Sequence, residues 1–157
     1  MSRIMASLSW NFLRYGFIAA GALNIGGTLL FSKGLSNAVV TSQYPQIFSR
    51  EGLMNIMIWG GAYLAAVPSL EVGREKQPWT YAILAVDKAF YTGTWLMWVT
   101  RQPSLLSTLQ DIFSRDALSA LFMAGYGFND AVFGAVAAVA TVKALKERRR
   151  TDGQKAS

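Results

Sequence analysis

Three ionisable side chains lie near the middle of long apolar stretches in this chain of 157 residues. Asp87 and Lys88 are neighbours within the run Trp79–Val99, and Asp130 lies within the last apolar run, 117–145. Each run is long enough to cross a lipid bilayer as a helix, which takes about 20 mostly apolar residues. A charge at the centre of such a helix costs roughly 2.5–3.5 kcal/mol on insertion scales. We therefore expect these three side chains to compensate one another inside a helix bundle.

Lys88 and Asp130 are predicted to form an ion pair. Counted from the helix ends that face the same side of the membrane, they lie at depths of roughly 16 and 20 Å, at about 1.5 Å per residue. The long lysine side chain can span that difference. A buried ion pair of this kind satisfies the rule that charges in lipid are paired and hydrogen-bonded.

Asp87 needs other partners, because it lies about 100° around the helix from Lys88. We expect hydrogen bonds to it from nearby polar residues, the candidates being Asn24, Asn129, Tyr91 and Tyr126. With two acids and one lysine, one carboxylate lacks a lysine partner unless Arg14 reaches it or it stays protonated. Such a cluster is a candidate proton relay, ion path or polar contact for a ligand, and it could also be a purely structural network.

Aromatic residues offer a second candidate site. Trp59 and Tyr63 are spaced by four on the second apolar run, so they share one helix face. Together with Tyr91 and Tyr126 they could line a cavity for a flat or lipid-like molecule. Ordinary packing within a helix bundle explains aromatic stripes of this kind equally simply.

The composition excludes several kinds of chemistry. The chain has no cysteine and no histidine, which removes thiolate nucleophiles, thiolate metal sites, the usual haem ligand and the commonest general base. It also lacks a phosphate-binding loop and a Ser/His/Asp set. We therefore expect no metal and no cofactor, and we do not favour an enzyme. The net charge of +6 does not indicate nucleic-acid binding, because much of it follows the last apolar run.

Hydrophobic residues make up 52% of the chain and charged residues 15%, which is typical of a membrane protein. The predicted fold is all-α, with four transmembrane helices arranged as two tandem hairpins. The spans are about 10–31, 53–70, 79–99 and 117–145, within a membrane domain 1–146 that is followed by a basic tail, 147–157. Between the third and fourth spans, 103–113 is predicted to form a short helix at the membrane surface.

Small residues mark the faces on which the helices should pack closely. On the first span Gly16, Ala20, Asn24 and Gly27 share a face, which would point Asn24 into the bundle. On the second span the expected edge consists of Gly61, Ala65 and Pro68. Pro68 is also expected to kink or end that helix.

The distribution of positive charge orients the chain. Outside the spans or close to their ends, ten Lys and Arg residues fall on the side of both termini and four on the other side. Positive residues gather on the cytoplasmic side, so both termini should face the cytoplasm of a bacterial inner membrane. The first span is read as a retained helix and not as a cleaved signal peptide.

A short internal repeat supports two hairpins. The segment 47–51, IFSRE, returns 65 positions later as 112–116, IFSRD, and each copy precedes an apolar run. A repeat of two spans keeps its orientation in the membrane, which makes it a parallel repeat. The alternative is that a charged pair caps a helix at each outer interface.

The third span carries AVDKAFY at 85–91 and the fourth GYGFNDAVFG at 125–134. With the hairpin pattern, these segments resemble small uncharacterised four-helix proteins of the bacterial inner membrane. The resemblance implies the fold and no activity, and no functional residue is carried over from it.

These features together favour a non-enzymatic membrane protein with a buried polar centre. It would bind a lipid-like or quinone-like molecule, or a partner membrane protein, and membrane lipids surround it. A homo-oligomer is also expected. The alternatives are a proton- or ion-coupled small transporter or channel subunit and a purely structural network, while an enzyme acting on a lipid is least favoured.

Overall fold

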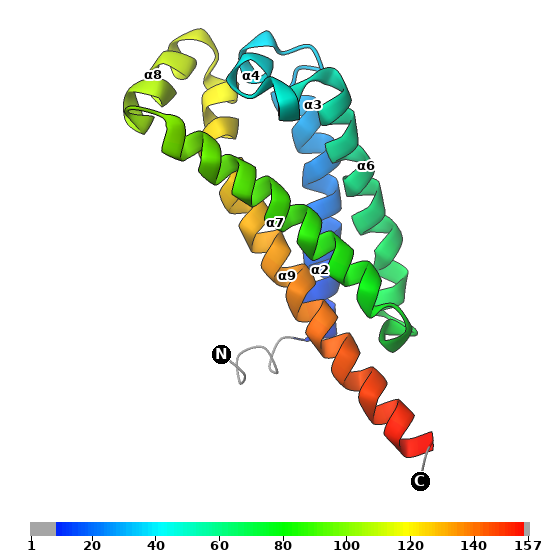
Figure 1. Ribbon diagram of the computed structural model, residues 1–157. Coiled ribbons are helices and arrows are strands. Elements are labelled where there is room, and N and C mark those ends of the chain that lie inside the picture. The colour runs from blue at the N-terminus through cyan, green and yellow to red at the C-terminus, as the bar shows by residue number, and fades with distance from the viewer. Residues whose placement is uncertain (1–8, 156–157) are drawn as a thin grey trace.

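The structure is a computed structural model that describes residues 9–155, and this part of the chain forms helices and turns without a β-strand (Figure 1). The predicted all-α class is therefore confirmed. Four long rods run in alternating directions. The first combines α2 (Trp10–Ala22), a π-helical turn (Leu23–Gly27) and α3 (Thr28–Phe31), and the others are α6 (Arg50–Ala66), α7 (Pro78–Arg101) and α9 (Ala117–Lys155).

Two helical segments of the described part, Arg50–Leu70 and Ala117–Gln154, are long and apolar enough to cross a membrane. This supports the assignment to membrane proteins at a coarse level. The first rod and α7 do not reach the length and hydropathy of these two segments, for local reasons. Asp87 and Lys88 lower the hydropathy of α7, and the π-helical turn divides the first rod into pieces of 13, 5 and 4 residues.

Short helices fill the connections at one end of the bundle. The expected loop 32–50 contains α4 (Ala38–Gln43) and α5 (Pro45–Phe48), separated at Tyr44 because Pro45 disfavours a helical residue before it. The predicted surface helix is present as α8 (Leu105–Arg115), capped by the hydroxyl of Ser104. At the other end, 3₁₀ turns at Val67–Leu70 and Arg74–Lys76 join α6 to α7.

Pro68 ends α6 as predicted, and a proline and a serine mark helix starts. Pro68 lies in the 3₁₀ turn that ends α6, and Pro78 is in the first turn of α7, where its missing N–H costs nothing. The Ser49 hydroxyl accepts a hydrogen bond from the Gly52 amide and so caps α6.

The buried apolar residues form two clusters. The lower one lies towards the beginning of α2 and includes Phe17, Tyr63, Tyr81, Leu84 and Ala137. The upper one lies under α4, α5 and α8 and includes Phe48, Leu53, Trp98, Ile112, Met123 and Tyr126. Along α7 the polar pair at 87–88 falls between Leu84 of the lower cluster and Trp98 of the upper one. The polar centre thus separates two apolar cores.

Gly60 allows the first rod to approach α6 closely. A Cβ atom at this position would lie 2.9 Å from Asn24 Cβ and 3.0 Å from the Gly21 carbonyl oxygen. The predicted edge at Gly61 is wrong, since nothing lies within 4 Å of a Cβ there. Neighbouring residues point about 100° apart on a helix, so only one of two adjacent glycines can face the partner helix.

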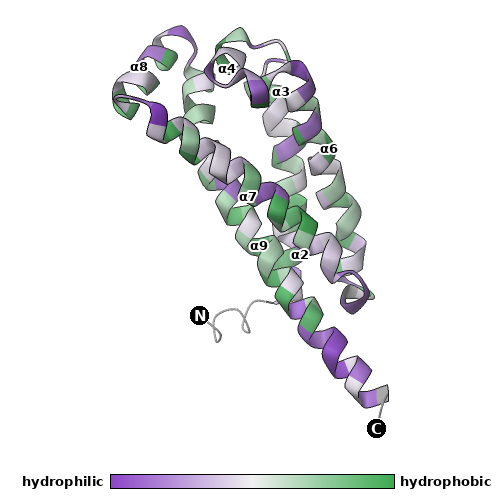
Figure 2. Ribbon diagram, viewed as in Figure 1, coloured by the Kyte–Doolittle hydropathy of each residue, from purple (hydrophilic) through white to green (hydrophobic). Residues whose placement is uncertain are grey.

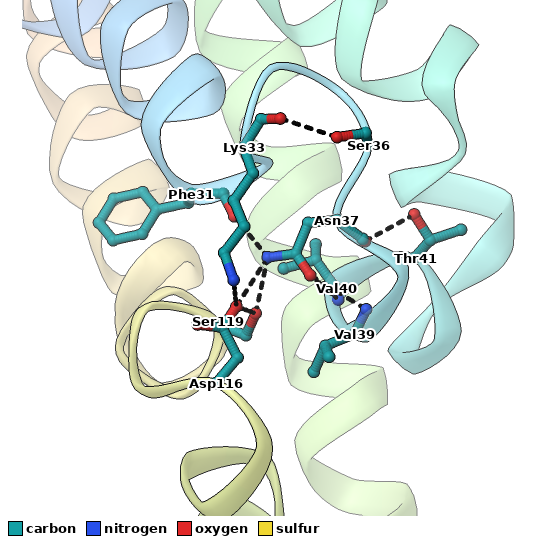
Figure 3. A network of polar contacts seen from close by, with 9 residues as sticks. All are labelled: Phe31, Lys33, Ser36, Asn37, Val39, Val40, Thr41, Asp116 and Ser119. Atoms are coloured by element: carbon teal, nitrogen blue, oxygen red, sulfur yellow. Dashed lines mark hydrogen bonds and ion pairs between the residues drawn. The ribbon is translucent and has the colours of Figure 1, made fainter.

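A polar network closes the upper end of the bundle (Figure 3). Asn37 Oδ1 accepts hydrogen bonds from the amides of α4, while Asn37 Nδ2 donates to Phe31 O, to Asp116 Oδ2 and to Ser119 Oγ, each at 2.9 Å. Lys33 Nζ lies 3.2 Å from Asp116 Oδ2. This network joins the first connection to the beginning of α9.

Lys33 adopts an unusual backbone conformation to make that contact. The amides of Lys33 and Gly34 donate to the carbonyls of Leu30 and Leu29, which is the Schellman pattern that ends a helix. Lys33 therefore has a φ of 51°, in the left-handed region where glycine is usual. The ion pair with Asp116 accounts for a lysine at this position.

The two copies of the internal repeat differ locally. In the first copy Ser49 caps α6, whereas in the second copy Ser114 lies inside α8 and its hydroxyl donates to the Asp111 carbonyl. The helix α6 begins at Arg50, within the first copy, whereas α9 begins at Ala117, after the second copy has ended. The repeat stays a prediction, without a shared cap to support it.

The predicted basic tail is not separate from the fourth rod, because it continues α9 as a helix as far as Lys155 (Figure 1). Lys, Arg, Glu and Ala have high helix propensity, and an Arg148–Asp152 contact at 3.9 Å has the spacing that favours a helix.

The two glycines of α6 give a first prediction. Gly60→Ala should lower the stability of the purified protein, by about 1–3 kcal/mol, because the new methyl group overlaps the first rod. Gly61→Ala is the matched control and should have little effect or stabilise slightly, since it adds helix propensity in open space. Thermal unfolding in detergent measures both. Equal melting temperatures would contradict the close contact.

The upper network gives a pH prediction. Hydrogen bonds from Ser119 and Asn37, with the Lys33 charge, lower the pKa of Asp116 from 3.8 to about 2. Because its pKa is lower in the folded protein, ionised Asp116 stabilises the fold at pH values above its pKa in the unfolded chain. This contribution is lost as the pH falls through about 2. The melting temperature should therefore fall more steeply between about pH 4 and pH 2 for the wild type than for Asp116→Asn. Asp111→Asn, at an exposed ion pair with Arg115, should keep the wild-type slope. Parallel pH profiles for the wild type and Asp116→Asn would contradict this role.

Candidate functional site: a buried polar centre beside a cavity

Lys88 is the centre of the site. It is 1% exposed, and its Nζ atom forms an ion pair with Asp130 Oδ1 and donates a hydrogen bond to Asn24 Oδ1 at 2.8 Å. The predicted pairing of Lys88 with Asp130 is confirmed. Three rods therefore meet at one ammonium group, and α7 and α9 are joined at the level that counting residues predicted.

Asn24 reaches Lys88 from the π-helical turn of the first rod. A π turn takes one residue more than an α turn and so changes which side chains face the bundle. Asn24 is 5% exposed and Thr28, after the turn, is 5% exposed, whereas Gly27 is only partly buried. The predicted inward-facing side of the first rod is therefore correct as far as Asn24. Beyond the π turn, Thr28 faces the bundle in place of Gly27.

Two close approaches hold α7 against α9 on either side of Asp130. A Cβ atom at Gly127 would lie 2.2 Å from Trp95 Cγ, and one at Gly134 would lie 3.1 Å from Lys88 Cβ. The Trp95 indole also donates to the Met123 carbonyl at 2.8 Å. Gly134 lets the lysine stem lie against α9, and the ammonium group reaches Asp130.

Asp87 has no hydrogen bond within the described part of the chain, although it is only 7% exposed. The expected hydrogen bonds from Asn24, Asn129, Tyr91 and Tyr126 are therefore wrong. Asn24 directs its oxygen at Lys88, and the Tyr91 hydroxyl accepts from Asn55 Nδ2 at 3.1 Å. Arg14 does not reach the centre either, because it pairs with Glu71 at 2.6 Å near the beginning of α2.

A cavity of about 260 Å³ lies beside the ion pair, between the first rod, α6, α7 and α9. Six of the seven predicted polar site residues line it, namely Asn24, Lys88, Tyr91, Tyr126, Asn129 and Asp130. The other walls are apolar and include Phe31, Ile56 and Phe122. A mostly apolar cavity with a few convergent polar groups is the usual form of a small-molecule site.

Two tyrosine hydroxyls among the lining residues have hydrogen-bonding capacity to spare. The Tyr126 hydroxyl is buried without a hydrogen-bond partner among residues 9–155. The nearby Thr94 hydroxyl donates to the Tyr91 carbonyl and makes no bond of acceptable geometry to Tyr126. The Tyr91 hydroxyl accepts from Asn55, which leaves its own proton to donate. Both can donate to an acceptor atom in the cavity.

Of the four aromatic residues predicted to line a cavity, Tyr91 and Tyr126 do so, whereas Trp59 and Tyr63 lie elsewhere. Tyr63 is fully buried in the lower apolar cluster, and its hydroxyl donates to the Leu84 carbonyl at 2.9 Å. Trp59 packs against the same cluster. Tyr63 still contributes to the centre, because Lys88 Nζ lies 5.8 Å from its ring centroid, within the range of a cation–π contact.

Sequence reasoning missed Asn55 and the apolar wall residues. Asn55 is a polar residue within the second apolar run, a signal of the same kind as Asn24. Phe31 and Phe122 carry no such signal, and only the fold brings their rings to 5.5 Å between centroids.

Comparison of the chain with known protein families, curated proteins and solved structures finds no match. The fold and the site together define an all-helical protein with two helices long and apolar enough to cross a membrane, and with a buried, paired lysine beside a cavity.

The ion pair gives a prediction for stability. Lys88→Met leaves Asp130 to stay charged without a counter-ion or to take up a proton, and either should destabilise the fold, by about 3–5 kcal/mol. The double variant Lys88→Met/Asp130→Leu should recover most of that loss, because no buried charge of the pair is left. Unfolding in mixed detergent micelles of the wild type, Lys88→Met, Asp130→Leu and the double variant measures the coupling between the two residues. Additive effects of the two single variants would contradict the pairing.

Proposed function

We propose that the chain crosses the membrane four times, with both termini on the cytoplasmic side of a bacterial inner membrane. The rods alternate in direction, and α7 has 24 residues, about 36 Å as a helix. Trp10 Nε1 donates to Glu147 Oε1 at 2.8 Å, so the beginning of α2 and the basic part of α9 lie at the same end. Figure 2 shows that hydrophilic residues concentrate in that part of α9. Positive charge at this end favours the cytoplasm.

Outward-facing apolar residues on the rods support contact with lipid. Ile58 on α6, Val86 and Phe90 on α7 and Phe128 on α9 are 58–70% exposed. A face of this kind is costly in water and favourable against acyl chains.

The proposed function is non-enzymatic binding of a neutral, lipid-like or quinone-like molecule whose polar end enters the cavity. The observation that carries this proposal is the cavity beside Lys88, lined by two hydroxyls that have protons to donate. Lys88 is already neutralised by Asp130, so an anionic head group would find no free positive charge there to pair with. Carbonyl or ether oxygens are the acceptors that fit tyrosine hydroxyl donors.

The size of the cavity limits how the molecule would bind. Pockets for whole drug-sized ligands measure about 300–1,000 Å³, and this one measures about 260 Å³. A head group or a single ring fits, and an acyl or isoprenoid tail does not. Leu23 and Leu121 line the cavity and are 48% and 63% exposed, so a tail could pass them into the surrounding lipid.

The binding proposal is tested by filling the cavity. Gly125 lines the cavity and a Cβ atom there meets nothing within 4 Å, so Gly125→Leu places its side chain in that space. We expect roughly tenfold less co-purified lipid-like ligand than in the wild type, equivalent to about 1.4 kcal/mol. Native mass spectrometry with solvent extraction of the purified protein measures the ligand.

Gly61→Leu is the control, because Gly61 also has open space around it and does not line the cavity. It should retain the ligand. Equal ligand content in the Gly125→Leu and Gly61→Leu proteins, or no specific ligand in the wild type, would contradict the proposed function.

A further inference from the structure

Asp87 is the one member of the predicted polar centre that neither lines the cavity nor joins the ion pair. It is 7% exposed, and its Oδ2 atom is buried without a hydrogen-bond partner among the described residues. A carboxylate that stays ionised under these conditions has lost its hydration without gaining a hydrogen bond at that oxygen. Its charge state therefore needs a separate explanation.

Among the side chains that the structure describes, none supplies Asp87 with a free positive charge. On its own helix it is next to Lys88, whose ammonium group is engaged with Asp130 and Asn24. From α9 it faces Asp130, a like charge that disfavours a second anion.

Tyrosines are the other titratable neighbours of Asp87. Tyr63 of α6 and Tyr91 of α7 lie within electrostatic range of it. The Tyr63 hydroxyl donates to the Leu84 carbonyl and is not available to the carboxylate. Arg14, the remaining cation considered from the sequence, pairs with Glu71.

We propose that Asp87 is a proton-binding site, which holds one proton while Lys88 and Asp130 remain ionised. The centre then carries one positive and one negative charge and is neutral as a whole. Neutrality is what a low-dielectric surrounding requires of three ionisable groups with only one base among them. The residue that holds the proton is one position along α7 from Lys88.

The proposal predicts how many protonated carboxyl groups the protein contains at neutral pH. Infrared spectroscopy of the protein in lipid nanodiscs detects the C=O stretch of a protonated carboxyl group, which shifts in heavy water. The wild type should show one such band, and the isosteric variant Asp87→Asn should lose it. Asp111→Asn removes a carboxylate that is 65% exposed on α8, and it should leave the band unchanged.

A further pair of variants counts protons at the centre. Lys88→Met removes the counter-ion of Asp130, so both acids should be protonated and the band should double. Asp87→Asn/Lys88→Met should return it to the intensity of one carboxyl group. If the Lys88 variants do not fold, Asp87→Asn against the wild type decides the question.

The proposal is overturned if the wild type shows no protonated carboxyl band at neutral pH, or if Asp87→Asn leaves the band in place. The readout does not depend on a bound molecule, because the band should persist in protein from which lipid-like ligands have been extracted. Failure of the binding proposal and failure of the proton site are thus separate results.

Discussion

A lysine enclosed by apolar helices must have its charge neutralised within the protein, and the arrangement of the four rods follows from this constraint. Lys88 meets Asp130 from α9 and Asn24 from the first rod. Because both partners are needed at one point, α7 and α9 pack closely, with Gly127 and Gly134 clearing space on either side of Asp130. The pair is therefore a condition for the close packing of these helices as much as a result of it.

The same constraint explains why the two apolar clusters are separate and why a cavity adjoins the polar centre. Polar groups at the centre cannot be covered by simple interdigitation of apolar side chains, since each needs a partner of defined geometry. The π-helical turn at Leu23–Gly27 brings Asn24 to the lysine, and the cavity lies between this turn and α9. Single π turns are frequent at functional sites, which agrees with a binding role for this one.

The sequence predicted the features that depend on depth and composition. Counting residues from the helix ends was sufficient to pair Lys88 with Asp130, because helical rise is nearly constant. Pro68 marked the end of α6 for a reason that is local to a few residues. The all-α class was predicted from the long apolar runs, and the polar residues that line the cavity were predicted from their positions within those runs.

Features that depend on the rotation of a helix or on tertiary contacts were not predictable. Gly60 and Gly61 are equivalent by composition, and only the position of the first rod distinguishes them. The partners expected for Asp87 are engaged elsewhere, since Tyr91 accepts from Asn55 and Asn24 faces Lys88. The contact of Asn37 with Asp116 joins residues 79 positions apart, and neither side chain alone indicates it.

The most direct measurement is a solid-state NMR experiment on the protein in lipid bilayers that detects dipolar coupling between Lys88 Nζ and the Asp130 carboxyl carbon. A strong coupling that is insensitive to added salt is expected, because a buried pair is screened far less than an exposed one. Absence of that coupling, with Lys88 Nζ in contact only with water or lipid head groups, would contradict the buried ion pair on which the site depends.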